Sequence, residues 1–315
     1  MRATALRLYS NSPASQATVQ QLAKTLGPAA IAPDDHSESS SSGTFSSALY
    51  YSKLRPETKN GRVLMHAEEI VSTQTFVLEN SACDDSVVCV ADRQTAGRGR
   101  GQNTWDSPLG CLMFSFRSAF PSAYGSKLPF FQYLVSLALV EGCRKATDGA
   151  CDVNIKWPND VYANKSVKIG GILCQSHHDG GKFVVTTGIG LNVENEHPTT
   201  CLSTLCKRKV RREVVLAEFF NAFDVIYSQF LRGDGYEEGP SFEPFLRDYH
   251  AQWLHSGQRV EVDNAKQMVT IQGISPKTGA LLAMDDQGKL LELTPDGNRL
   301  DFFKGLVSKK IPDQL

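Results

Sequence analysis

Apolar residues recur at three- and four-residue spacing in three stretches of the chain, and this period predicts amphipathic helices. The helices are expected over residues 128–145, 213–231 and 242–254. Short apolar runs bounded by turn-forming residues predict buried strands. These are expected over residues 87–91, 111–116, 153–155, 169–175 and 183–193. Together these elements indicate a globular domain, which we place at residues 61–254.

The pattern changes after Trp253, where short stretches of alternating apolar and polar residues are separated by Gly and Asp turns. Four such stretches, residues 259–262, 269–274, 281–284 and 290–293, predict a small, barrel-like all-β module. We therefore expect a second domain over residues 255–315.

Residues 1–60 form a separate segment, and two interpretations fit its beginning. Basic residues and serines without an acidic residue before Asp34 are typical of an organelle transit peptide. Alternatively, residues 5–9 form a strand and residues 14–26 a helix that ends at Gly27. Residues 37–47 are serine-rich without apolar periodicity, which predicts a linker. The expected location is cytoplasmic, with plastid or mitochondrial targeting as the alternative.

Composition and charge narrow the class of function. Of 315 residues, 41% are hydrophobic and 21% are charged, as in an ordinary soluble globular protein. The formal net charge of −1 gives no bulk attraction to nucleic acid or to an anionic membrane. No apolar run approaches the roughly 20 residues that span a bilayer. Eight scattered cysteines without zinc-ligand spacing predict reduced thiols. We expect neither nucleic acid nor a membrane as a partner.

A glycine–arginine segment is the first candidate for chemistry. In Gln94-Thr-Ala-Gly-Arg-Gly-Arg-Gly-Gln-Asn-Thr-Trp105, three glycines alternate with Arg98 and Arg100. Glycine lets the backbone approach a ligand closely, and arginine can bind a phosphate through two parallel hydrogen bonds. The segment therefore predicts a loop that closes over an anionic substrate. A plain surface loop is one alternative. An RNA-binding segment is another, disfavoured because there is a single short copy without an aromatic platform.

Two further segments place glycines beside polar residues. Lys156-Trp-Pro-Asn-Asp160 predicts a tight turn between strands, and Lys168-Ile-Gly-Gly-Ile172 follows it. Turn formation accounts for Pro-Asn-Asp, but lysines at the mouth of a hairpin beside paired glycines suit an anionic ligand. Gly188-Ile-Gly-Leu-Asn192 ends a strand with two glycines and an amide side chain, and a β-bulge is the alternative interpretation.

Together, these segments resemble the biotin–protein ligase (holocarboxylase synthetase) family. The resemblance covers about residues 62–308 and is closest to plant members. It is specific because several independent motifs occur in the same order and spacing. They are Gly97-Arg-Gly-Arg100, Trp105-Asp-Ser-Pro-Leu-Gly110, Lys156-Trp-Pro-Asn-Asp160, Lys168-Ile-Gly-Gly-Ile-Leu173, Gly188-Ile-Gly-Leu-Asn192 and the tail Thr294-Pro-Asp-Gly-Asn298 with Asp301-Phe-Phe-Lys-Gly-Leu306.

The resemblance implies an α/β (α+β) catalytic domain related to class II aminoacyl-tRNA synthetases and biotin–lipoate ligases, followed by a small SH3-like β-barrel. It implies that Lys168, Arg98 and Arg100 are catalytic. The implied biotin-binding residues are Ser72, Thr73, Gln74, Gln94, Arg98, Gly99, Arg100, Lys168 and Gly171, with Gln74 where the family most often has Asn. The implied ATP-binding residues are Trp105, Lys156, Asn159, Asp160 and Asn192.

The implied activity is ATP-dependent attachment of biotin to a lysine in the carrier domain of biotin-dependent carboxylases. The biotin carboxylate would attack the α-phosphate of ATP to give biotinyl-5′-AMP, and the carrier lysine would then take the biotin. Mg²⁺ would accompany ATP, with Asp160 as the one candidate protein ligand. A lipoate–protein ligase, with the same chemistry, is the nearest alternative. A silent paralogue that only binds biotin is another, suggested by Gln74 and Gln102.

Overall fold

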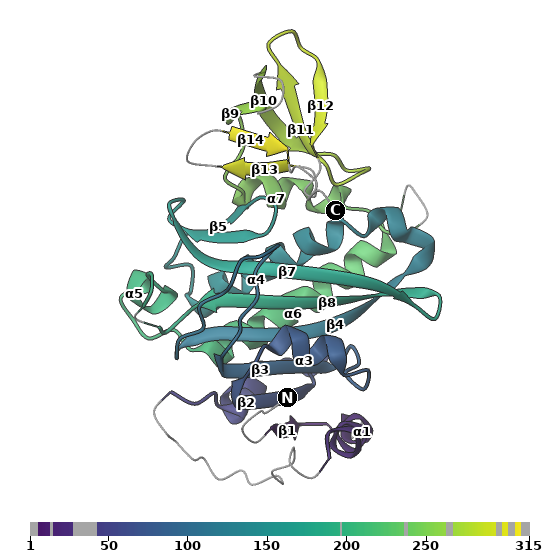
Figure 1. Cartoon of the computed structure of the whole chain (residues 1–315), viewed down its shortest axis with the longest axis vertical. Coiled ribbons are helices and arrows are strands. Elements are labelled where there is room, and N and C mark those ends of the chain that lie inside the picture. The colour runs from purple at the N-terminus through teal and green to yellow at the C-terminus, as the bar shows by residue number, and fades with distance from the viewer. Residues whose placement is uncertain are drawn as a thin grey trace.

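A computed structural model describes residues 6–12, 15–27, 43–195, 197–235, 239–262, 267–293, 298–301 and 306–309 (Figure 1). The main domain is built on a mixed eight-stranded sheet with the strand order β1-β2-β3-β4-β8-β7-β6-β5. Strands β2 and β3 run parallel, and the other neighbours run antiparallel. The strands are β1 (Arg7–Ser10), β2 (Val63–Ile70), β3 (Val87–Gln94), β4 (Cys111–Pro121), β5 (Val153–Lys156), β6 (Asp160–Ala163), β7 (Val167–Asp179) and β8 (Lys182–Asn192).

Helices cover both faces of this sheet. α4 (Phe130–Ala146) and α6 (Arg212–Arg232) pack together on one face, and α2 (Ser47–Lys53) lies beside α6. α1 (Gln16–Leu26) and α3 (Thr73–Glu79) cover the other face near β2 and β3. The two-residue period of the strands explains this division. Leu64 and Val88 belong to the cluster under α4 and α6, whereas Met65 and Cys89 pack with α1 and α3.

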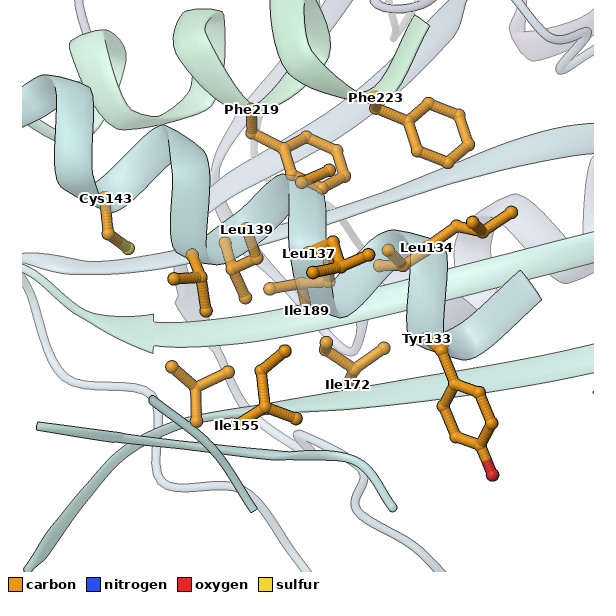
Figure 2. Packing of buried hydrophobic residues seen from close by; sticks show 14 of the residues in the cluster. Tyr133, Leu134, Leu137, Leu139, Cys143, Ile155, Ile172, Ile189, Phe219 and Phe223 are labelled. Atoms are coloured by element: carbon orange, nitrogen blue, oxygen red, sulfur yellow. The ribbon is translucent and has the colours of Figure 1, made fainter. Parts of the chain in front are cut away.

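The larger core lies between α4, α6 and the sheet (Figure 2). α4 is apolar on nearly all sides because it is enclosed by β-strands on one side and by α6 on the other. Phe219 of α6 meets Phe116 of β4 edge-on, with ring centroids 5.6 Å apart. α6 is long and apolar enough to meet the criteria for a membrane span, but its phenylalanines are buried in this core.

The C-terminal module has its own sheet. Four strands, in the order β12-β11-β10-β9, are antiparallel, and β14 joins β9 in parallel with β13 beside it. The predicted small all-β module is therefore present, whereas the SH3-like barrel stays a prediction. The strands are β9 (Arg259–Val262), β10 (Gln267–Ile274), β11 (Leu281–Asp285), β12 (Leu290–Leu293), β13 (Asn298–Asp301) and β14 (Leu306–Lys309).

Several element boundaries differ from the sequence prediction. The strand and helix expected near the N-terminus are present as β1 and α1. Most of the predicted linker lies outside the described residues, but Phe45 is buried and Ser46 caps α2, so ordered structure begins before residue 47. The helix expected over residues 242–254 is divided into a 3₁₀ turn (Glu243–Phe245) and α7 (Leu246–Gln252). The elements that were not predicted include α2, α3, α5 (Leu202–Cys206), β2, β6, β13 and β14.

Candidate active site

Two glycines of β8 provide the floor of the candidate site. Ile189 points into the core under α4, so Gly188 and Gly190 face the opposite side of the sheet. A Cβ atom at Gly190 would lie 2.4 Å from Cε2 of Trp105, and one at Gly188 would lie 2.7 Å from Oε1 of Gln74. The register of β4 with β8 is continuous here, so the β-bulge interpretation is wrong. Because these glycines have no side chains, Trp105 and Gln74 can pack directly against the backbone of β8.

The start of α3 is tied to the glycine–arginine loop by Gln94. Ser72 caps α3, and its hydroxyl oxygen accepts from the N–H of Thr75 at 3.4 Å. The Thr73 N–H donates to Oε1 of Gln94 at 2.8 Å. The Nε2 atom of the same side chain donates to Ser107 at 3.0 Å, at the far end of the loop. The predicted residues Ser72, Thr73 and Gln94 therefore lie together.

Gln74 connects α3 to the sheet. Its side chain is buried, and Nε2 donates to the carbonyl oxygen of Leu173 in β7 at 3.0 Å. The amide consequently lies across Gly188, between β7 and β8. This contact shows that the longer side chain fits at the position where the resembled family most often has Asn.

The glycine–arginine loop is a short hairpin. The N–H of Trp105 donates to the carbonyl of Gly97 at 2.9 Å, and the N–H of Gly99 donates to the carbonyl of Asn103 at 2.8 Å. At its tip, Gly101 has φ of 61°, in the left-handed region that glycine adopts readily. Its two arginines differ. Arg98 is exposed, whereas Arg100 is partly buried and extends toward the β5–β6 turn.

Arg100 joins the loop to that turn, because its Nη1 atom donates to Oδ1 of Asn159 at 3.3 Å. Asn159 is itself held by β7: its Nδ2 atom donates to the carbonyl of Ile172 at 2.9 Å, and its carbonyl accepts from the N–H of Ile172 at 2.9 Å. Arg100 thus connects the loop to Asn159, a residue that two hydrogen bonds hold against β7.

A cluster of charges lies beside this contact. The Nζ atom of Lys168 lies 2.7 Å from Oδ1 of Asp160, and the Nζ atom of Lys156 lies 3.8 Å from Oδ2. The pairing of β6 with β7 brings them together, with Asp160 opposite Gly171 and a register shift between Val161 and Tyr162. The side chain of Lys168 is 43% exposed, against 15% for Lys156, so Lys168 is the cation that an anionic ligand reaches more easily.

The structure therefore brings most predicted residues to one face of the sheet. Gly171 lies between Trp105, Asp160 and Lys168, since a Cβ atom there would be 3.7 to 3.9 Å from all three. Asn192 lies on the same face as Gly190, but its Nδ2 atom donates to Thr199 at 2.8 Å and so supports the following loop.

Some residues of this site were missed in the sequence. Gly188 and Gly190 were recognised as a motif but given no role in the site, although two glycines two positions apart on a strand must lie on one face. Ser107 and Gln132 gave no local signal. Gln132 of α4 donates from Nε2 to the carbonyl of Pro158 at 2.7 Å and so holds the β5–β6 turn from below.

Comparison with known proteins identifies the family of this chain. Residues 67–192 match the model of the biotin/lipoate A/B protein ligase family. The chain is 44% identical to biotin–protein ligase 2 of Arabidopsis thaliana over 268 residues, which cover 80% of this chain and 78% of that protein. The chain belongs to the biotin–protein ligase family. The human biotin–protein ligase is 32% identical over 87% of this chain, but these residues are only 39% of the human protein.

A solved structure extends the family resemblance to the fold. The biotin protein ligase from Aquifex aeolicus in complex with biotin and ATP superimposes with a TM-score of 0.60 at 27% identity, over 75% of this chain and 95% of that one. The mixed sheet with its helices is thus the fold of the biotin–protein ligase family.

Proposed function

We propose that this chain is an ATP-dependent biotin–protein ligase, which forms biotinyl-5′-AMP and transfers biotin to a lysine of a carboxylase carrier domain. Membership of the family supports the reaction. The observation that carries the assignment is the site itself. Lys168, Asp160 and the Arg100–Asn159 contact surround the glycine floor on which Trp105 and Gln74 lie.

The chemistry requires two anions to meet. The biotin carboxylate attacks the α-phosphate of ATP, a P–O bond forms, and pyrophosphate leaves. We infer that Lys168 neutralises charge between the carboxylate and the phosphate, and that Arg100 and Arg98 add positive charge from the loop; the exposure of Lys168 beside Asp160 and the Arg100–Asn159 contact support this. The carrier lysine amine then attacks the acyl carbon, and AMP leaves. Each step depends on positioning and charge, so no covalent enzyme intermediate is needed.

We propose that Mg²⁺ enters with the nucleotide. Among the described residues, no group of three or more His, Cys, Asp or Glu side chains could hold a metal ion. Both oxygens of Asp160 already face lysines, Lys168 at 2.7 Å and Lys156 at 3.8 Å. A carboxylate so neutralised is a poor sole ligand, and we derive no step from a metal held by the protein.

The deciding experiment supplies the protein with biotin, Mg·ATP and an apo biotin-carrier domain, and detects biotin bound to the carrier. One parallel sample lacks ATP, and another contains lipoate in place of biotin. Label that requires ATP and biotin supports the proposal. Transfer of lipoate instead identifies a lipoate ligase, and biotin binding without any transfer identifies a silent paralogue.

Replacing Arg100 with Gly is expected to release the adenylate. The variant loses the bond to Asn159 that holds the loop tip, worth about 1 kcal/mol and hence a several-fold change in loop closure. Free biotinyl-5′-AMP, measured after acid quench, should rise several-fold relative to transferred biotin. In a double-mutant cycle, the effects of Arg100→Gly and Asn159→Ala on adenylate retention should be less than additive, although Asn159→Ala also removes the bond to the carbonyl of Ile172. Additive effects, or no rise in free adenylate, would show that this contact does not retain the intermediate.

Replacing Gly190 with Ala is expected to raise the KM for ATP by about tenfold, because the indole of Trp105 must move off the sheet. Gly125→Ala is the matched control, since its Cβ atom would meet the ring of Phe183 at 3.0 Å, away from the candidate site. Steady-state kinetics measures the KM for ATP, and tryptophan fluorescence reports the displacement of the Trp105 indole. An unchanged KM for ATP in Gly190→Ala would show that Trp105 does not contribute to ATP binding.

Further parts of the proposal concern architecture and location. We propose that the C-terminal module is an SH3-like barrel, since its four antiparallel strands and the parallel β9–β14 pair form one sheet on which Val260, Val269 and Ala283 are buried. We also propose a cytoplasmic enzyme, with plastid or mitochondrial import directed by residues 1–60 as the alternative. Fluorescent fusions with and without these residues separate the two locations.

A further inference from the structure

We propose that His255 is a positioning residue for the adenylation step, through which the C-terminal module holds the β5–β6 turn in its working geometry. The inference rests on the proposed function of that turn, which carries Lys156, Asn159 and Asp160. The β5–β6 turn contacts the segment that begins the C-terminal module. The backbone N–H of Trp157 donates to Nε2 of His255 at 3.0 Å.

The hydrogen bonds of His255 define its protonation state. A backbone N–H can only donate, so Nε2 of the ring accepts and carries no proton. The proton is therefore on Nδ1, which donates to Oε1 of Gln258 at 2.9 Å. Burial lowers the pKa of His255 to about 4, against a rise from the Gln258 hydrogen bond and with a smaller lowering from Lys156. The ring is consequently neutral at pH 7, and its acceptor nitrogen stays directed at the turn.

A second connection reaches the same tryptophan. Nε1 of Trp157 donates to the hydroxyl of Tyr133 at 2.9 Å, and this hydroxyl donates to the carbonyl of Gly279 at 2.7 Å. Gly279 lies between β10 and β11, in the C-terminal module. The fully enclosed Trp157 is thus held at its backbone by His255 and at its indole by the Tyr133–Gly279 pair.

The backbone at this junction is also continuous with the sheet. The N–H of Leu254 donates to the carbonyl of Ile155 at 3.0 Å, and Trp253 forms an isolated parallel bridge with the same residue. Residues 253–255 therefore pair with the edge strand β5 at Ile155, the residue immediately before Lys156. A shift of the C-terminal module would therefore move Lys156 and Asp160. Lys168, on the neighbouring strand, would then lose its present distance to Asp160. Small displacements of such groups cost up to about a hundredfold in rate.

The chain contains a matched control. His250 of α7 accepts from the N–H of Ile274 through Nε2 at 3.2 Å, so it makes the same kind of bond at the same junction. That bond joins α7 to β10 and does not involve the β5–β6 turn. His250→Leu therefore removes a comparable hydrogen bond at the junction and keeps an apolar group beside Trp253, whose ring lies 4.9 Å from that of His250. His255→Leu instead removes the bond to Trp157. In His255→Gln, an amide oxygen can take the place of Nε2.

The experiment measures both halves of the inference with the full-length chain. Biotin-dependent ATP–pyrophosphate exchange gives kcat and KM, and hydrogen–deuterium exchange follows the peptide covering residues 153–163. In His255→Leu, kcat/KM for ATP should fall between about tenfold and about a hundredfold while the KM for biotin changes by less than about threefold. Exchange in the 153–163 peptide should accelerate. His255→Gln should restore both values toward wild type, and His250→Leu should change neither.

Equal losses in His255→Leu and His250→Leu would overturn the inference, as would unaltered exchange at residues 153–163 or a failure of Gln to restore it. The exchange measurement does not depend on the reaction. If the wild-type protein forms no biotinyl adenylate, the proposed function fails, and the exchange data still decide whether His255 positions the turn.

Discussion

Replacing Lys168 with Ala should reduce the rate of biotinyl-adenylate formation by about a hundredfold to a thousandfold, the cost of removing one well-placed group that stabilises developing charge. Lys168 combines the two properties this role needs. Its Nζ atom is fixed 2.7 Å from Asp160, and its side chain is 43% exposed on the face that carries the glycine floor. Alanine would leave Asp160 facing Lys156 alone, at 3.8 Å.

The same substitution should leave the folded state nearly unchanged. An ion pair with a partner this exposed contributes at most about 1 kcal/mol to the free energy of unfolding. Pyrophosphate release measures the chemical step, and urea unfolding measures stability. Lys182→Ala is the control, because Lys182 is exposed at the other end of the β7–β8 hairpin. If Lys168→Ala retains near-normal pyrophosphate release, Lys168 does not neutralise charge in this step.

Local patterns predicted those parts of the site that depend on local structure. Pro158, Asn159 and Asp160 predicted a turn between strands, and the structure has it between β5 and β6. The glycines around Arg98 and Arg100 predicted a loop, and the structure has a hairpin there. These features follow from the conformations that glycine and proline permit. The identity of the family came from the order of the motifs, which no single motif supplies.

Features that depend on distant residues were not predictable in this way. The distance between Lys168 and Asp160 is set by the register of β6 with β7, including a shift at Val161 that has no signature in the sequence. α3 is only seven residues long and too short for a helical period to be recognised, although it carries Thr73 and Gln74. The bond from Trp157 to His255 joins residues 98 positions apart.

The basic segment of residues 207–212 shows the same limit. Five of these six residues are basic, a composition typical of a solvated loop before a helix. This holds for Arg208, which pairs with Asp148 at the surface. It does not hold for Arg212, whose side chain is only 2% exposed. Arg212 is the first residue of α6, which packs against the sheet. Its guanidinium group is therefore buried, and Nη1 donates to the carbonyl of Cys111 in β4 at 3.3 Å.

Replacing Arg212 with Met should destabilise the protein by about 3 to 5 kcal/mol, the usual cost of removing one partner from a buried ion pair. Nη2 of Arg212 donates to Asp92 at 2.9 Å and to the carbonyl of Gly43 at 2.7 Å. Methionine fills much of the volume but removes the cation from the buried Asp92 carboxylate, which then faces His66 at 2.8 Å. Because Asp92 is on β3, which leads directly to Gln94 and the glycine–arginine loop, ligation should decline together with stability.

Urea unfolding followed by circular dichroism measures the loss, with Arg208→Met as the control. The Arg208–Asp148 pair is of similar length, 2.7 Å, but its side chains are 43% and 83% exposed. Solvent screening limits such a pair to about 1 kcal/mol or less, so the two variants separate burial from charge. Equal destabilisation by both would mean that the interior pair contributes no more than a surface pair. A larger loss in Arg212→Met would show instead that the start of α6 and the strand beneath the loop are held together by this one guanidinium group.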